Sequence, residues 1–217
     1  PTAVPDDELL ILSVSVGNVG RLGDLTESLE HRVYRRPLHI AHVSPSELPE
    51  HWIGLESVDY IRWDEANPTT LSERQLNALI EWVRQGGTLL ILASPADGSF
   101  ALKKSLDAVL PVQIGELITV TQLQSLYDAR LKGMKDPPPA PIYSPPIPLV
   151  RCKARDGASV IARDDDGRSD LITSRREGRG LIMFCGVTEK HLLQQAGSAI
   201  SLYEALFQLS REECEEA

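Results

Sequence analysis

The sequence has few cysteines, less basic than acidic charge, and no long apolar run. Its 217 residues include three cysteines, Cys152, Cys185 and Cys214, whose spacings fit no Cys-x-x-Cys metal or redox motif. No stretch of about 18 apolar residues occurs, which excludes a membrane-spanning helix from this segment. Lysine and arginine total 22 against 31 aspartates and glutamates, a net charge of −9. This balance argues against nonspecific binding to nucleic acid or to anionic lipid.

A secretory signal pattern of basic, apolar and small-residue segments is also missing from the start of the sequence. Pro1 is not a natural initiator, so we expect this sequence to be a piece of a longer protein whose compartment it does not reveal. Hydrophobic residues make up 42% and charged residues 24%, an ordinary globular composition. A chain of this length buries roughly 70% of its unfolded surface, so we expect a single domain over residues 1–217 without metal or disulfides.

The first half of the sequence alternates apolar runs with a helical pattern. Strands are expected at 9–16, 37–43, 58–63 and 88–93, and helices at about 23–33 and 72–85. The run 9–16 is almost continuously apolar, which is typical of a strand buried on both faces. Ser72 and Gln75 form a capping box, and Gly86-Gly87 ends the helix that begins there. This order predicts an α/β fold: a flavodoxin-like wound, mostly parallel sheet with helices on both faces.

The second half is richer in turns. We expect a helix at 101–110, an extended segment at 112–123, short strands at 149–154, 159–163, 171–174 and 181–186, and a terminal helix at 199–209. Seven prolines in the thirteen residues 136–148 predict a loop without regular hydrogen bonds. Turns are expected at 164–167 and 175–180. A hairpin-rich excursion over about 149–180 therefore rejoins the sheet near Leu181.

The residues that commonly bind metals or cofactors do not form a convincing set. His39 and His42 stand three apart on a predicted strand, which directs them to opposite faces. The aspartates at 164–166 stop short of the calcium-loop pattern and indicate a solvated turn. Cys152 and Cys185 are expected as small buried hydrophobes, and Cys214 lies among carboxylates that disfavour its thiolate. With no Walker loop in the sequence, we predict neither a metal nor a cofactor.

One glycine-containing turn lies where a phosphate could bind. Gly17-Asn18-Val19-Gly20 follows a buried strand and precedes a helix. The dinucleotide fingerprint Gly-x-Gly-x-x-Gly is not met, because Gly17, Gly20 and Gly23 lack the tight first pair and Arg21 does not restore it. A structural turn is favoured, with Gly17, Asn18, Gly20 and Arg21 as candidate ligand contacts.

Ser94 ends a predicted strand, at the sheet edge where open α/β sheets place ligands and catalysis. A nucleophile elbow requires Gly-x-Ser-x-Gly, whereas Leu92 and Ala96 flank this serine. Pro95 removes the backbone donor that would complete an oxyanion hole. We therefore interpret Ser94, with Asp97 and the strand-end Asp64, as candidate ligand contacts rather than as catalytic machinery.

Residues 71–91 resemble the helix-to-strand unit of class I glutamine amidotransferase-like domains, and Val58-Asp59-Tyr60 resembles the stretch before it. The segment from Gly178 to Phe184 resembles the late Gly-x-Gly strand of the same family. In particular the pattern looks like a noncatalytic branch found in bacterial membrane-associated proteins of unknown function. The resemblance covers about residues 8–95 and 170–209.

The resemblance implies the fold without glutaminase chemistry. Ser94 stands roughly where the catalytic family has a cysteine, and Val187 stands where it has a histidine. Only Glu189 agrees with the family's carboxylate, and His191 lies two residues beyond it. The implied protein is a pseudoenzyme, an extramembrane domain of a membrane-anchored bacterial protein.

Three functions are therefore in competition. The leading hypothesis is a noncatalytic domain that binds a protein or a small molecule at the carboxyl end of the sheet, over residues 17–21, 64–68 and 94–98. The proline segment supplies a second contact in this view, since it has little conformational entropy to lose. The rival is a hydrolase using Ser94 with His191 or His42 and a carboxylate, Glu189 or Asp97. A third hypothesis is sugar or nucleotide binding in the same cleft.

Overall fold

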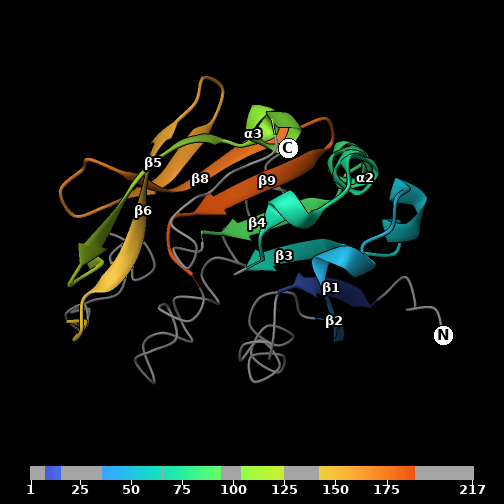
Figure 1. Cartoon of the computed structure of the whole chain (residues 1–217), viewed down its shortest axis with the longest axis horizontal. Helices are drawn as coiled ribbons and strands as arrows, with labels where there is room; N and C mark the ends of the chain where they lie inside the picture. Colours follow the sequence, from blue (N-terminus) through green and yellow to red (C-terminus); the bar gives the residue numbers. More distant parts are fainter. Residues whose placement is uncertain (1–7, 16–35, 65, 94–103, 125–141, 189–217) are drawn as a thin grey trace.

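The computed structural model of the chain describes residues 8–15, 36–64, 66–93, 104–124 and 142–188. Seven strands of this described part form one sheet in the order β2-β1-β3-β4-β9-β8-β7 (Figure 1). They are β1 (Leu9–Val14), β2 (Leu38–Val43), β3 (Tyr60–Asp64), β4 (Thr88–Leu92), β7 (Ser159–Arg163), β8 (Asp170–Glu177) and β9 (Gly180–Cys185). The pairs from β2 to β9 are parallel, and β9-β8-β7 are antiparallel. The predicted α/β fold with a mostly parallel sheet is confirmed.

A second, smaller sheet is a two-stranded antiparallel ribbon of β5 (Val112–Val120) and β6 (Ile147–Ala154). The ribbon lies beside the antiparallel end of the main sheet (Figure 1). The backbone N–H of Val150 in β6 donates to the carbonyl of Gly186, directly after β9. The ribbon is thus attached to the sheet through β6.

Helices α2 (Glu73–Arg84) and α3 (Lys104–Val109) lie on the same side of the main sheet (Figure 1). Short 3-10 helices, η3 (Pro45–Glu47), η4 (Trp52–Leu55) and η5 (Pro68–Thr70), connect the elements around α2. The capping box is confirmed: the Ser72 hydroxyl accepts from the Gln75 N–H, and the Gln75 side chain accepts from the Ser72 N–H. The helices expected at 23–33 and 199–209 lie outside the described residues, so a helix layer on the other face stays a prediction.

Strand alternation divides the core between two faces of the sheet. The α2 face consists of strand side chains, Ile61, Trp63, Leu89, Ile91, Ile182 and Phe184, packed against Leu76, Leu79 and Val83 of α2. The opposite face consists of Leu9, Ile11, Tyr60, Leu90, Met183 and Cys185, packed against Ile147 and Leu149 of the ribbon. Both faces of the central strands are buried, as expected for parallel strands.

The prediction of a turn over residues 175–180 is wrong in its extent. Strand β8 continues through Glu177, which pairs with Gly180, so the turn consists of Gly178 (φ +64°) and Arg179 alone. Three charged residues continue the strand because they pair with β9, and Glu177 is held there by an ion pair of 2.9 Å with Arg84 of α2. β7 and β8 also belong to the main sheet, so the chain joins that sheet before Leu181.

The proline segment is partly regular. Strand β6 begins at Ile147, inside the range 136–148 that was expected to lack regular hydrogen bonds, and Pro148 pairs opposite Thr119. A proline fits this position because alternate N–H groups of β6 point away from β5 and need no partner there. Residues 137–141 lie outside the described part.

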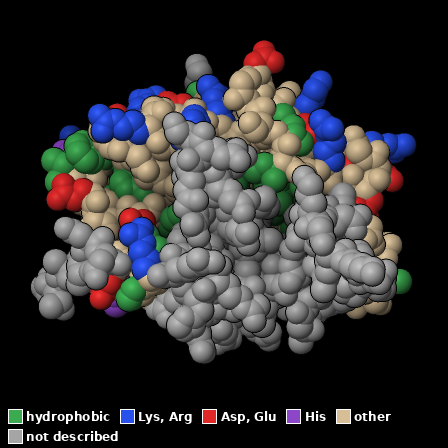
Figure 2. Space-filling model, turned by 180° about the vertical axis from the view of Figure 1, so that it is seen from behind, with side chains coloured by type: hydrophobic (Ala, Val, Ile, Leu, Met, Phe, Trp, Pro, Cys, Tyr) green, Lys and Arg blue, Asp and Glu red, His purple; other side chains and the backbone are tan. Residues whose placement is uncertain are grey.

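The described surface carries both signs of charge. On the face shown in Figure 2, Lys and Arg side chains are spread around the rim among Asp and Glu side chains. In the described ranges, no helix combines the length and apolarity that crossing a membrane requires.

Candidate functional site

Of the residues that the sequence analysis names for a site, the structure describes Asp64, the neighbouring residues 66–68 and His42. The others are Gly17, Asn18, Gly20, Arg21, Ser94, Asp97, Glu189 and His191, and they lie outside the described residues. Asp64 is the last residue of β3, at the edge where β1, β4 and β9 also end. The prediction that Asp64 lies at the carboxyl end of the sheet is confirmed, and its role in binding stays a prediction.

Asp64 belongs to a buried ion pair. Its Oδ2 accepts a hydrogen bond of 2.7 Å from an Nη of Arg62, and the other Nη of Arg62 donates to the Ser13 hydroxyl at 2.7 Å. The exposed fractions of Ser13, Arg62 and Asp64 are 0%, 1% and 6%. Charge-assisted hydrogen bonds at these distances compensate for much of the desolvation of both charges. The three side chains therefore act as one fixed polar group inside an apolar core.

The strand geometry explains why these side chains meet. Arg62 and Asp64 are two residues apart on β3, so both point to the face opposite α2, whereas Trp63 between them points to the α2 face. Ser13 of β1 stands directly opposite Arg62 in the parallel register. The chain passes from β1 outward to β2 and then returns to the other side of β1 for β3. The cluster thus bridges the two strands at which the direction of winding reverses.

Sequence reasoning found Asp64 but missed Ser13 and Arg62. The signal was present, because an arginine inside a strand expected to be buried requires a partner. The partner at i+2 on the same strand follows from strand periodicity, and the partner on β1 follows only from the sheet order.

His42 lies beside this cluster, opposite Ser13 in the register of β2 and β1. Partial burial, and then the positive charge of Arg62, lower the pKa of His42 from its usual 6.5. The imidazole is therefore neutral at pH 7, and its protonation is disfavoured in the folded chain.

We expect this lowered pKa to make the folded chain less stable as the pH falls below about 6.5, because the unfolded state takes up the proton at higher pH. The measurement is an NMR titration of the His42 ring, which should give a midpoint below 6.5. In urea unfolding between about pH 7 and pH 5, a His42→Gln variant should lose less stability than wild type. A midpoint at or above 6.5 would contradict the proximity of Arg62.

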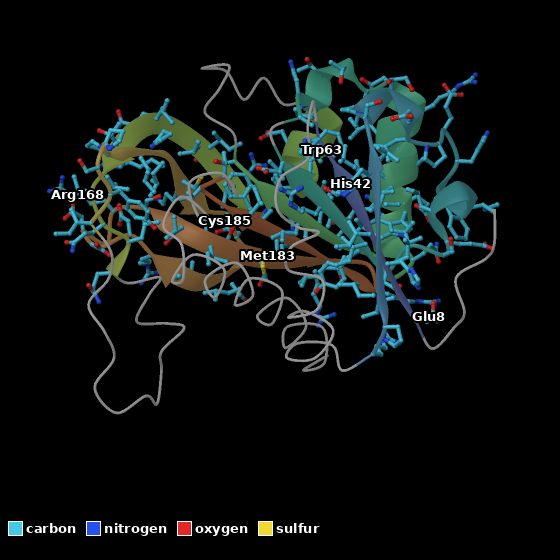
Figure 3. All side chains as sticks on the ribbon, turned by 90° about the horizontal axis from the view of Figure 1, so that it is seen from below. Glu8, His42, Trp63, Arg168, Met183 and Cys185 are labelled. Carbon is cyan, nitrogen blue, oxygen red and sulfur yellow. The ribbon has the colours of Figure 1, made fainter. Side chains whose placement is uncertain are left out.

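The two described cysteines are not nucleophiles. Burial raises the pKa of both Cys152 and Cys185 to about 12, so each is a thiol at neutral pH. Figure 3 shows Cys185 and Met183 on neighbouring inward positions of β9. The expectation that Cys152 and Cys185 are buried is confirmed. Val187, which the proposed resemblance aligns with a histidine, is fully buried among apolar side chains.

No group of three or more His, Cys, Asp and Glu side chains that could hold a metal ion occurs among the described residues. His39 hydrogen bonds to Glu8, whereas His42 lies at the other end of β2 (Figure 3). Asp164 is engaged in its own turn, since its Oδ1 accepts from the N–H groups of Arg168 and Ser169. The expected turn at 164–167 is confirmed.

Comparisons of the sequence with known proteins identify no relative: no family model matches, and no curated protein matches. The fold does match solved structures. One is a cytoplasmic protein of Salmonella typhimurium, with a TM-score of 0.67 at 14% identity, covering 93% of this chain and 98% of that one. Another is a ThuA-like protein of Bacteroides uniformis, with a TM-score of 0.57 at 11% identity, covering 95% and 92%.

Longer enzymes contain the same fold as one part. The exo-β-1,4-mannosidase of an Opitutaceae bacterium matches with a TM-score of 0.52 at 17% identity. The match covers 93% of this chain but 35% of the mannosidase. At these identities the likeness concerns the fold alone.

Proposed function

We propose that this chain is a noncatalytic binding domain with the class I glutamine amidotransferase-like fold, part of a larger bacterial protein. A protein partner or a small molecule binds at the carboxyl end of the parallel sheet. In this proposal the Ser13–Arg62–Asp64 cluster forms the floor of the site, and Arg21 and Asp97 are the further contacts that the sequence predicts.

One observation carries this proposal: the buried Arg62–Asp64 pair lies on β3 beside β1, at the pair of strands where the winding of the sheet reverses. The strand order β2-β1-β3-β4, continued by β9, is that of flavodoxin-like sheets. In open α/β sheets, ligands bind outside the carboxyl ends of the strands where the winding reverses. A buried ion pair can often be replaced by apolar residues of similar volume without loss of stability. The presence of the Arg62–Asp64 pair at such a place therefore favours a binding role over a purely structural one.

The chemistry of the described residues favours binding over catalysis. Covalent catalysis needs an activated nucleophile within reach of a base. The two described thiols are protonated because of their burial, and the Asp64 carboxylate is held by Arg62. Val187 offers no proton acceptor. The occurrence of this fold within a longer mannosidase supports the view that it serves as one domain of a larger chain.

We expect a thermal-shift screen of the whole chain against sugars, nucleotides and amino acids at millimolar concentration to identify a ligand. Binding at 100 times Kd stabilises by about 2.7 kcal/mol, which raises the Tm of a domain of this size by roughly 5–10 °C. A flat screen, together with no partner captured by the immobilised chain, would contradict the proposal.

A pair of arginine variants locates the binding surface. Arg21→Ala, at a contact that the sequence predicts, should weaken binding of the identified ligand about tenfold, as expected for a lost charge-assisted contact. Arg179→Ala, in the β8–β9 turn at the amino edge, should leave the affinity unchanged. Equal losses in both variants would place the ligand elsewhere.

The same preparation tests the hydrolase alternative. We expect no release of ammonia from glutamine, and no hydrolysis of p-nitrophenyl acetate above that of the Ser94→Ala variant. Turnover that Ser94→Ala abolishes would overturn the noncatalytic assignment.

A further inference from the structure

Among the described residues, strand β5 is an unpaired sheet edge. Three N–H groups of its partner β6 donate hydrogen bonds away from β5. The Val150 N–H donates to the Gly186 carbonyl, the Cys152 N–H to the Ser169 hydroxyl, and the Ala154 N–H to the Asp170 carboxylate. Because backbone groups alternate in direction along a strand, the residues opposite Val150 and Pro148 point their own N–H and C=O away from β6. These residues are Leu117 and Thr119. In the described part of the chain, β5 pairs with β6 and with no other strand.

Beyond the register irregularity between Ile114 and Leu117, the described part of this edge has few of the devices that usually protect a sheet edge. β5 holds no lysine, arginine or proline, and Glu116, its one charged residue, is ion-paired with Arg151 at 2.6 Å. Leu117 is 48% exposed, unusual for a large apolar side chain, and Thr119 is exposed as well. Natural proteins block long edges with charges, prolines or covering segments, because an open edge adds strands from other chains. An open edge with β-branched and apolar residues is therefore suited to pair with a strand from another chain.

An acidic pocket of about 390 Å³ lies at the end of this edge. It is lined by the consecutive residues 118–122 and by Asp164, Asp165 and Asp166 of the β7–β8 turn. Residues 118–120 belong to β5 and residues 121–122 follow it directly, so the pocket lies along the end of this strand. Arg151, the cation of this lining, is already paired with Glu116. The described lining of the pocket thus has net negative charge, and it lies beside Thr119, whose backbone groups point away from β6.

We propose that β5 is a docking edge for an extended, basic peptide segment of a partner protein. The peptide adds a strand beside Leu117 and Thr119, its main chain bonding to their outward N–H and C=O groups. A lysine or arginine of the peptide enters the pocket and faces Asp166, whereas Asp165 already accepts a hydrogen bond from the Gln124 N–H. The backbone supplies affinity, and the acidic pocket supplies the preference for positive charge. This surface is separate from the carboxyl-edge site and does not depend on it.

Fluorescence anisotropy of the whole chain with a fluorescein-labelled peptide, Thr-Val-Lys-Val-Lys-Val-Thr, tests the proposal. We expect a Kd of roughly 10–100 μM. The same peptide with glutamate for lysine should bind at least about tenfold more weakly, because of the pocket's charge. A backbone N-methylated lysine peptide should also lose about tenfold or more, because it lacks the donors that pair with an edge. Absence of binding at about 1 mM lysine peptide would overturn the proposal.

Variants of the chain locate the contact. Thr119→Pro removes an outward N–H and should weaken the lysine peptide about tenfold. Asp166→Asn should weaken it about threefold, whereas Asp156→Asn, the same change in the β6–β7 turn outside the pocket, should not. Unchanged binding in both Thr119→Pro and Asp166→Asn would overturn the assignment. A wild-type dimer that Thr119→Pro dissociates would assign the edge to a second copy and would likewise overturn it.

Discussion

Replacing Gly180 by alanine is expected to destabilise the chain by about 3–5 kcal/mol, because the new methyl group has no space. A Cβ at this position would lie 2.0 Å from the carbonyl oxygen of Val83 and 2.3 Å from that of Gly87. Both are backbone atoms at the end of α2, held there by hydrogen bonds from Arg179 N–H to the Arg84 carbonyl and from Leu181 N–H to the Gly87 carbonyl. Relief of the clash requires breaking this junction. Urea unfolding followed by circular dichroism measures the loss.

The control separates this contact from the general effect of removing a glycine. Gly157 has a φ of +79°, and a methyl group added to it would have no atom within 4 Å, so Gly157→Ala tests conformational strain alone. We expect it to cost about 1–2 kcal/mol, the ordinary penalty of a left-handed alanine. Should Gly180→Ala cost no more than Gly157→Ala, the close packing of the β8–β9 turn on α2 would be refuted.

Asp64→Leu is expected to destabilise the chain by about 3–5 kcal/mol, because it leaves the Arg62 guanidinium buried without its carboxylate. Arg62 is 1% exposed and cannot reach water without displacing its neighbours. The double variant Arg62→Met/Asp64→Leu removes both charges, and we expect its stability to lie within about 1–2 kcal/mol of wild type. A double-mutant cycle in urea therefore gives a large coupling energy between the two positions.

A matched ion pair on the surface provides the control. Arg155 and Asp107 are also 2.7 Å apart, but their side chains are 28% and 45% exposed. Asp107→Ala should cost only about 0.5–1 kcal/mol, since water solvates the remaining guanidinium. Similar costs at Asp64 and Asp107 would mean that Arg62 finds water or another partner. The double variant also serves the functional test, because it keeps the fold while removing the charged floor of the proposed site.

The sequence predicted the helices, strands and turns that depend mainly on interactions between residues close together in the chain. The Ser72–Gln75 capping box and the spacing of Leu76, Leu79 and Val83 define α2 before any tertiary contact is known. The continuous apolar runs predicted central strands buried on both faces, and β1, β3 and β4 are such strands. The aspartate-rich turn before Gly167 formed where expected, since Asp164 bonds to the backbone of its own turn.

Other features depend on which strands become neighbours. The charged residues at 175–177 suggested a turn, yet pairing with β9 makes them strand. The prolines near β6 suggested an irregular loop, yet Pro148 is accommodated at a position whose N–H needs no partner. In both places a long-range pairing outweighs local propensity, which no window of sequence can report.

What the sequence determined by itself is the class of fold, because patterns of burial along each strand specify an α/β sheet. That the residues around Ser94 lack a nucleophile elbow is an interpretation of the sequence, and the noncatalytic role stays a prediction. The tertiary structure alone decided that Ser13, Arg62 and Asp64 form one cluster, because parallel register places β1 beside β3. Within the described ranges it also left β5 paired with β6 alone, while the other side of β6 bonds to the main sheet at Gly186. The partner of a buried charge and the unpaired edge of a strand depend on which strands become adjacent in the fold. Short segments of the sequence do not specify either of them.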